Sequence, residues 1–250
     1  MRYAHYIPQF IMALVLLSSP PVLAQVAAAK IDDILAKSGL QREIEQQPDA
    51  SVMLETIKNH IKSHMTSSEL DSVLAWFDSD LGRKINKAEE DASSAEAYSQ
   101  MRQFSAGLQS QPPDPLRKQL ISELDRAARM SELMTGMKIS MALNMAGVGE
   151  SAWGHKVSYK DQMIAQINSR RALIQERSSR QVMERSLFTY RSISDNELKQ
   201  YIDFFNSATG KKYTDTVTKA LLTAVENSNQ QAAREMRNSV KSGETSPEGT

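Results

Sequence analysis

One block of the sequence occurs twice, and this repetition constrains the fold more than any other feature. Residues 65–86 (MTSSELDSVLAWFDSDLGRKIN, the first block) align without a gap to residues 193–214 (ISDNELKQYIDFFNSATGKKYT, the second block), at an offset of 128. The identical pairs are Glu69/Glu197, Leu70/Leu198, Phe77/Phe205, Ser79/Ser207, Gly82/Gly210 and Lys84/Lys212. Such self-similarity predicts two related helical units.

Each block is predicted to form a helix, a corner and a second helix. The first helix begins with a capping box, in which the N-cap hydroxyl accepts from the N3 amide while the N3 glutamate accepts from the N-cap amide. A serine then N-caps the second helix, and a glycine in its first turn lets two backbones approach because it has no Cβ. The residues in these roles are Thr66, Glu69, Ser79 and Gly82 in the first block and Ser194, Glu197, Ser207 and Gly210 in the second. All these roles are structural, so the blocks predict no chemistry.

A weaker sequence similarity between the two units lies upstream of the blocks. Ile31, Ile34, Leu40 and Ile44 correspond to Ile121, Leu124, Met130 and Met134 at an offset of 90. The two offsets differ by 38 residues, which predicts an insertion in the second unit. We expect this insertion to extend the pair 116–146 and 159–190 into a long antiparallel helical hairpin.

Helical periodicity dominates the remainder of the chain, so we predict an all-α fold. Apolar residues recur three and four positions apart, and no segment alternates as a strand would. Glycine and proline fall at breaks such as Gly39, the proline cluster at 112–115 and the glycines at 147–149. The expected organisation is a first unit (25–110), a proline-rich linker (111–115), a second unit (116–236) and a disordered tail (237–250), whose Ser/Gly/Glu-rich sequence has no periodicity.

The first 24 residues are predicted to be a secretory signal peptide. A weakly positive start precedes an apolar stretch from Phe10 to Leu17, and small residues mark a cleavage site after Ala24. No cysteine follows for lipid attachment, and no later stretch is apolar enough to cross a bilayer. We therefore expect a periplasmic or secreted protein without a transmembrane segment after cleavage.

Composition excludes several classes of function. The 30 Lys and Arg residues equal the 30 Asp and Glu residues in number, so the basic surplus of a nucleic-acid binder is absent. The chain has no cysteine, which removes thiol catalysis and thiolate-bound metals. The Gly147-Val148-Gly149 sequence follows a predicted helix and not a strand, which argues against a dinucleotide site. We identify no catalytic constellation and no cofactor site, and the acidic run Glu89-Glu90-Asp91 is interpreted as a solvated helix face.

Two histidines are weak candidates for a metal site. His60 and His64 lie four residues apart, so one turn of a helix would place both on one face, where they would be able to bind Zn²⁺ or Cu²⁺. The glutamate that accompanies such a pair in metalloproteases is missing. We therefore interpret the pair as structural, and keep metal binding by His60, His64 and His155 as the alternative.

A row of methionines is a stronger candidate for a functional site than the histidine pair, and it would serve as an interaction surface. We call this row the methionine face, and it comprises Met130, Met134, Met137, Met141 and Met145. Their spacing places them along one side of a single helix. Flexible thioether chains adapt to irregular apolar partners, and in an oxidising compartment they also suit Cu(I). The face is therefore core, a groove for apolar peptides that includes the following Trp153, or a copper site.

Local charge is uneven although the total is balanced. From Thr66 to Gln100 there are eight acidic and three basic residues, and from Ser151 to Arg191 eight basic and three acidic. Complementary patches favour docking of one unit on the other or of one chain on a second. A basic surface for anionic lipid is the alternative.

The second block resembles a known family. The pattern E-L-x-x-x-I-x-F-F-x-S-x-x-G-K-K-Y, from Glu197 to Tyr213, is similar to the signature of a bacterial secreted family called domain of unknown function 2059. The first block, from Glu69 to Ile85, resembles it more loosely. The resemblance implies an all-helical extracytoplasmic protein and implies no activity.

Together these observations favour a non-enzymatic module that binds a protein or peptide of the cell envelope, as a chaperone or adaptor does. A periplasmic protein that handles copper or zinc is one alternative. A purely structural homo-oligomer, such as a homodimer, is the other.

Overall fold

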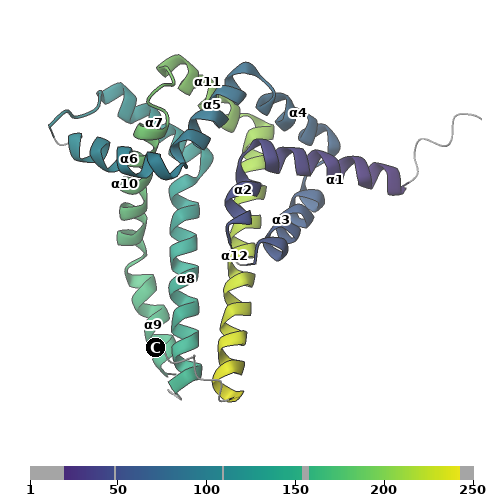
Figure 1. Ribbon diagram of the computed structural model, residues 1–250, viewed down its shortest axis with the longest axis vertical. Helices are drawn as coiled ribbons and strands as arrows, with labels where there is room; N and C mark the ends of the chain where they lie inside the picture. The colour runs from purple at the N-terminus through teal and green to yellow at the C-terminus, as the bar shows by residue number, and fades with distance from the viewer. Residues whose placement is uncertain (1–19, 48, 109, 154–157, 243–250) are drawn as a thin grey trace, which may run out of the picture.

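The computed structural model describes residues 20–47, 49–108, 110–153 and 158–242, which form twelve α-helices and no strand (Figure 1). The all-α prediction is confirmed over this part of the chain. The helices are α1 (Pro20–Lys37), α2 (Leu40–Glu45), α3 (Ala50–His64), α4 (Ser67–Phe77), α5 (Asp80–Ala92), α6 (Ala95–Gly107), α7 (Pro115–Ala128), α8 (Met130–Trp153), α9 (Ser158–Ser169), α10 (Arg171–Thr189), α11 (Asp195–Asn206) and α12 (Ala208–Ser242).

The helices form a broad head and a narrow extension (Figure 1). Helices α1 to α7 and α11 lie in the head. Helix α8 runs away from the head, α9 and α10 return to it, and α12 lies beside both α3 and α8. The extension thus contains the sequence that we predicted to be inserted in the second unit.

Both blocks fold as predicted. Thr66 with Glu69, and Ser194 with Glu197, form complete capping boxes at the starts of α4 and α11. The hydroxyls of Ser79 and Ser207 each accept a hydrogen bond of 3.0 Å, from the amides of Gly82 and Gly210 respectively. A Cβ on either glycine would collide with a backbone carbonyl oxygen, that of Trp76 or of Phe204. The glycines therefore allow the last turn of one helix to touch the first turn of the next.

A second pair of corners lies at equivalent positions upstream. Gly39 and Arg129, which are 90 residues apart, are the residues with positive φ in the described ranges, at 72° and 54°. Gly39 is the N-cap residue of α2, directly after the turn from α1, and Arg129 is the C-cap residue of α7, directly before α8. The predicted long hairpin is present, since α8 packs against α9 and α10, but its first arm begins at Met130 and not at Leu116, because the chain turns at Arg129. Glu132 and Asp215 both form ion pairs with the Arg129 side chain.

The two blocks pack on each other reciprocally. Lys84 of the first block forms an ion pair of 2.6 Å with Glu197, and the equivalent Lys212 forms one of 2.7 Å with Glu69. The equivalent rings of Trp76 and Phe204 stack on each other, with centroids 4.6 Å apart and planes 7° apart. A residue that contacts its own equivalent is the mark of a two-fold relationship. That both units descend from one ancestor stays a prediction.

Each of the two main cores contains residues of both predicted units. The first combines Leu70 and Val73 of α4 with Ala220 and Leu221 of α12, as well as apolar residues of α1 and α3. The second combines Ile85 of α5 with residues of α7 and α11, namely Leu120, Ile121, Leu124, Leu198 and Ile202. Trp76 packs against both cores. The units 25–110 and 116–236 therefore do not have separate cores.

Three further predicted boundaries are wrong. Helix α8 continues through Gly147 and Gly149, because a glycine inside a helix costs only about 1 kcal/mol. Helix α12 reaches Ser242, beyond the predicted start of the disordered tail at Arg237, since extending a helix is far less costly than nucleating one. The second arm of the hairpin, predicted as continuous, is divided at Arg170 into α9 and α10. Residues 243–250 and 1–19 lie outside the described ranges, and residues 20–24 belong to α1.

We predict that Gly82→Ala and Gly210→Ala each lower the free energy of unfolding by about 1–3 kcal/mol, because the new methyl group must displace backbone. Gly107→Ala is the matched control, since a Cβ there would meet nothing within 4 Å. We expect the control to leave stability unchanged or to raise it by up to about 1 kcal/mol, because alanine favours a helix more than glycine does. Urea unfolding followed by circular dichroism measures all three, and equal effects at Gly82 and Gly107 would contradict the close-approach account.

Candidate functional site

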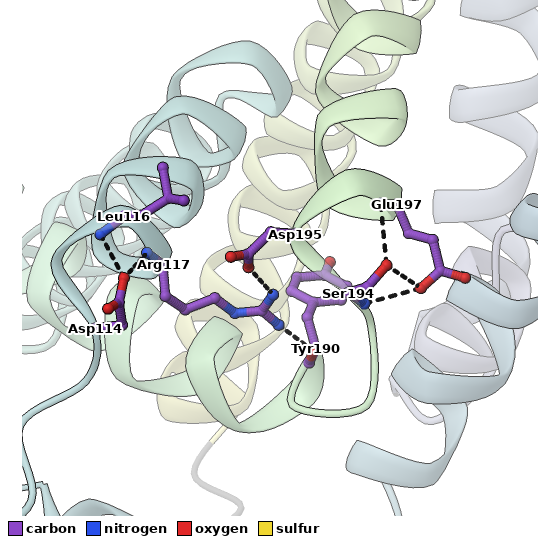
Figure 2. A network of polar contacts seen from close by, with 7 residues as sticks. All are labelled: Asp114, Leu116, Arg117, Tyr190, Ser194, Asp195 and Glu197. Atoms are coloured by element: carbon purple, nitrogen blue, oxygen red, sulfur yellow. Dashed lines mark hydrogen bonds and ion pairs between the residues drawn. The ribbon is translucent and has the colours of Figure 1, made fainter.

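A network of polar contacts fixes the backbone at Tyr190, where α10 ends (Figure 2). Asp114 N-caps α7 and accepts from the amides of Leu116 and Arg117. The largely buried Arg117 guanidinium forms an ion pair of 2.8 Å with Asp195, at the start of α11, and also donates to the carbonyl oxygen of Tyr190. The start of α7 is thereby joined to the turn between α10 and α11.

The Tyr190 side chain reaches a carboxylate on the opposite unit. Its hydroxyl donates to Oε1 of Glu89, on α5, at 2.7 Å, and the hydroxyl of Tyr201, on α11, donates to the same oxygen at 3.1 Å. Both tyrosines are buried. Glu89 therefore has two donors from the second unit, and no described residue donates to its Oε2.

The position of Glu89 corrects our interpretation of the acidic run. We expected Glu89, Glu90 and Asp91 to share a solvated face, whereas Glu89 faces the interior of the protein. Glu89 lies four residues after Ile85 and three before Ala92, both of which are buried on α5. Residues at these spacings share one helix face, so the sequence contained the signal.

Burial raises the pKa of the Glu89 carboxyl above its ordinary value, because a charge in an apolar site loses its hydration. The hydrogen bonds from Tyr190 and Tyr201 oppose this shift in the pKa, and nearby Glu43 reinforces it. Burial also raises the pKa of both tyrosine hydroxyls well above 10, so they remain donors. Two neutral tyrosine hydroxyls thus donate to the Glu89 carboxyl group, which takes up a proton more readily than an exposed glutamate does.

Glu89 lines two separate pockets of the protein. The polar cleft, of about 650 Å³, lies between α5 and the α1–α2 corner and is lined by charged residues that include Lys37, Arg42 and Glu90. The Glu89 pocket, of about 200 Å³, lies on the other side and is mostly apolar. Its lining residues are Glu89, Leu124, Ala128, Met130, Leu133, Tyr190, Tyr201, Phe205, Tyr213, Thr214, Val217, Thr218 and Leu221. The carboxylate thus stands between a polar and an apolar environment.

The methionine face passes from the core to the surface. Met130 packs against the second core and lines the Glu89 pocket. Met134 is half-buried, while Met137 and Met141 are 39% and 60% exposed. Met137 and Met141 therefore do not belong to the core, which was one of our interpretations of the face. The side chains of Met145 and Trp153 lie outside the described residues.

The two histidines stack on each other. The rings of His60 and His64 are 4.1 Å apart at their centroids, and His64 Nδ1 is 2.7 Å from the carbonyl oxygen of His60. Burial lowers the pKa of His60, and neighbouring His64 and Lys219 lower it further. In the described ranges no three His, Cys, Asp or Glu side chains come together as metal ligands would. His155 lies outside these ranges.

The oppositely charged stretches meet within one chain. Helix α10, which carries much of the basic stretch, packs against α5 and α6, which carry much of the acidic one. Within the part of the chain that the structure describes, no helix is both long and apolar enough to cross a bilayer.

The fold and the site define an all-α protein in which two helix-corner blocks pack reciprocally beside a half-buried carboxylate. Residues 52–111 match the family model DUF2059, whose description is an uncharacterized protein conserved in bacteria. The family resemblance is therefore confirmed for this segment, which contains the first block and Glu89, and stays a prediction for the second block. No curated protein and no solved structure matches the chain.

We predict that the capping glutamates make stability depend on pH. Hydrogen bonds from Lys212 to Glu69, and from Lys84 to Glu197, lower the pKa of each glutamate from 4.5 to about 2. A lowered pKa in the folded state contributes stability above pH 4.5 that is lost as the pH falls towards 2. The double variant Glu69→Gln/Glu197→Gln should lose less stability across this window than the wild type.

Urea midpoints measured from pH 6 to pH 2 test this prediction. Glu96→Gln is the control, because Glu96 also lies in the first turn of a helix but forms no ion pair with a described residue. A double variant whose midpoints fall as steeply as those of the wild type would show that the capping glutamates do not carry the effect.

Glu89 should make the stability of the fold depend on pH in the direction opposite to that of the capping glutamates. Its folded-state pKa is raised, so the folded protein holds the proton to a higher pH than the unfolded chain does. Stability must then fall as the pH rises from 4.5 through the raised value, by at most about 1.4 kcal/mol per pH unit. Glu89→Gln, whose amide oxygen still accepts from both tyrosines, should remove this decline. Calorimetric Tm values of both proteins between pH 4 and pH 8 measure the difference, and parallel curves would refute it.

Proposed function

We propose that the chain is a non-enzymatic module that binds a protein or peptide in the bacterial cell envelope, and that the exposed half of the methionine face is its contact surface. The observation that carries this proposal is the exposure of Met137 and Met141 on α8, at 39% and 60%. Exposed large apolar side chains on one side of a helix are typical of recognition surfaces.

The packing of α8 leaves this side uncovered. A Cβ on Gly136 would contact the Leu222 side chain, so this position faces α12, and Lys138 forms hydrogen bonds with α10. Met141 is five residues beyond Gly136, about 140° around the helix. Its side chain therefore points away from the α12 contact, where a partner is able to reach it.

The chemistry of the surface suits apolar segments of varied sequence. Methionine has an unbranched chain and a polarisable sulfur, so it adapts its shape to different partners. An amphipathic helix or an extended apolar peptide would lie along the row of thioethers. This is the behaviour of a chaperone or an adaptor.

The location in the envelope is part of the proposal. The bacterial family match supports a bacterial protein, and the sequence of residues 1–24 favours export to the periplasm or secretion. In that compartment, newly exported chains would offer apolar segments to the surface.

We predict that a photo-crosslinking residue at Met141 captures partner proteins in cells, and that one at Leu116 captures far fewer. Leu116 is a matched control because it is an apolar residue on another helix with a comparable exposure of 45%. Mass spectrometry identifies the products. A recurrent partner or a set of envelope proteins supports the proposal, whereas equal yields at the two sites, or no product at Met141, refute it.

A second pair of variants separates binding from folding. Met137→Lys/Met141→Lys should reduce the cross-links of a probe at Ser140 at least tenfold, and should change the free energy of unfolding by less than about 0.5 kcal/mol, because both side chains are exposed. Unchanged cross-linking in this folded variant would show that the methionines do not contact the partner.

A further inference from the structure

The Glu89 pocket has one ionisable acid and no basic residue in its described lining. Its volume is about 200 Å³, and residues of α5, α7, α8, α11 and α12 contribute to its lining. No lysine, arginine or histidine lines it. A cation that entered the pocket would therefore meet the Glu89 carboxylate without a competing basic side chain in the lining.

Aromatic rings surround the carboxyl group. Tyr190 and Tyr201 meet edge to face, with centroids 6.1 Å apart, and Tyr201 contacts Phe205 at 4.8 Å. Tyr213 adds another ring to the wall. Aromatic faces attract cations through their quadrupole, most strongly where water is excluded.

Two polar atoms of the lining residues have no hydrogen-bond partner among the described residues. Thr214 is 6% exposed, and its hydroxyl oxygen has no hydrogen-bond partner. Both hydrogen bonds of Glu89 go to Oε1, which leaves Oε2 without a donor among the described residues. Oε2 is therefore the oxygen of Glu89 that a cation is free to approach.

We propose that this pocket binds a small organic cation of the alkylammonium class, with Glu89 as its counter-ion and the aromatic rings around its alkyl groups. The thioether of Met130 and the side chains of Leu133 and Leu221 give the apolar contact that the alkyl groups need. A metal ion fits poorly, because one carboxylate and tyrosine hydroxyls offer too few oxygen ligands. An anion has no positive partner in the lining.

The proposal is independent of the methionine-face interaction, because Met137 and Met141 do not line the pocket. Cross-linking at Met141 and binding in the pocket therefore succeed or fail separately.

The test uses the full chain and tetramethylammonium chloride as the probe, at millimolar concentrations. We expect a saturable rise in Tm relative to sodium chloride at the same ionic strength, since a ligand that binds only the folded state stabilises it. The neutral molecule tert-butanol, which has a similar size and shape, should give no such rise. No response to tetramethylammonium, or an equal response to tert-butanol, overturns the proposal.

Two variants locate the site. Glu89→Gln should weaken binding of tetramethylammonium at least tenfold in isothermal titration calorimetry. Glu90→Gln should bind as the wild type does, because Glu90 lines the polar cleft and not the Glu89 pocket. Equal binding by Glu89→Gln and the wild type would overturn the proposal.

A measurement on the wild type remains decisive even if Glu89→Gln fails to fold. A proton and the cation compete for Glu89, so binding should release protons, which calorimetry in buffers of different ionisation enthalpy detects. The charged groups that influence Glu89 are Glu43 and Arg185, in addition to Tyr190 and Tyr201. Binding without proton release at a pH where Glu89 is protonated overturns the assignment of Glu89 as counter-ion.

Discussion

The structure depends on the close contact between the two helix-corner blocks. The contact is possible because Gly82 and Gly210 lack a side chain, which makes both corners sharp enough for Trp76 to stack on Phe204. This stack joins two cores that would otherwise be separate, since Trp76 packs against both. The ion pairs across the blocks are exposed and contribute little by comparison, so the apolar contact dominates.

The half-buried carboxylate of Glu89 is a consequence of this contact. Glu89 leaves the first block on α5, and the reciprocal packing brings Tyr190 and Tyr201 of the second unit to it. An apolar residue at this position would avoid the cost of burying a charge, and such replacements are often stabilising. The proposed cation site would give the acid at this position a role beyond stability.

Features that depend on local interactions could be predicted from the sequence, whereas those that depend on tertiary packing could not. The capping boxes at Thr66 and Ser194 involve residues three apart, so their spacing was sufficient. The turn at Arg129 could not be predicted, because arginine has no preference for a positive φ and contacts with Glu132 and Asp215 accompany the turn. The spacing of Glu89 from Ile85 and Ala92 indicated its helix face, but its contacts with Tyr190 and Tyr201 could not be predicted, because both partners are more than 100 residues away.

The exchange of ion pairs between equivalent lysines and glutamates has a consequence for assembly. Contacts of this reciprocal kind ordinarily join two subunits, and their strength then varies with protein concentration. Here both partners lie on one chain, so the linker through Pro115 and α8 to α10 sets an effective concentration that dilution does not change. The chain is thus a dimer-like arrangement of two units that dilution cannot separate.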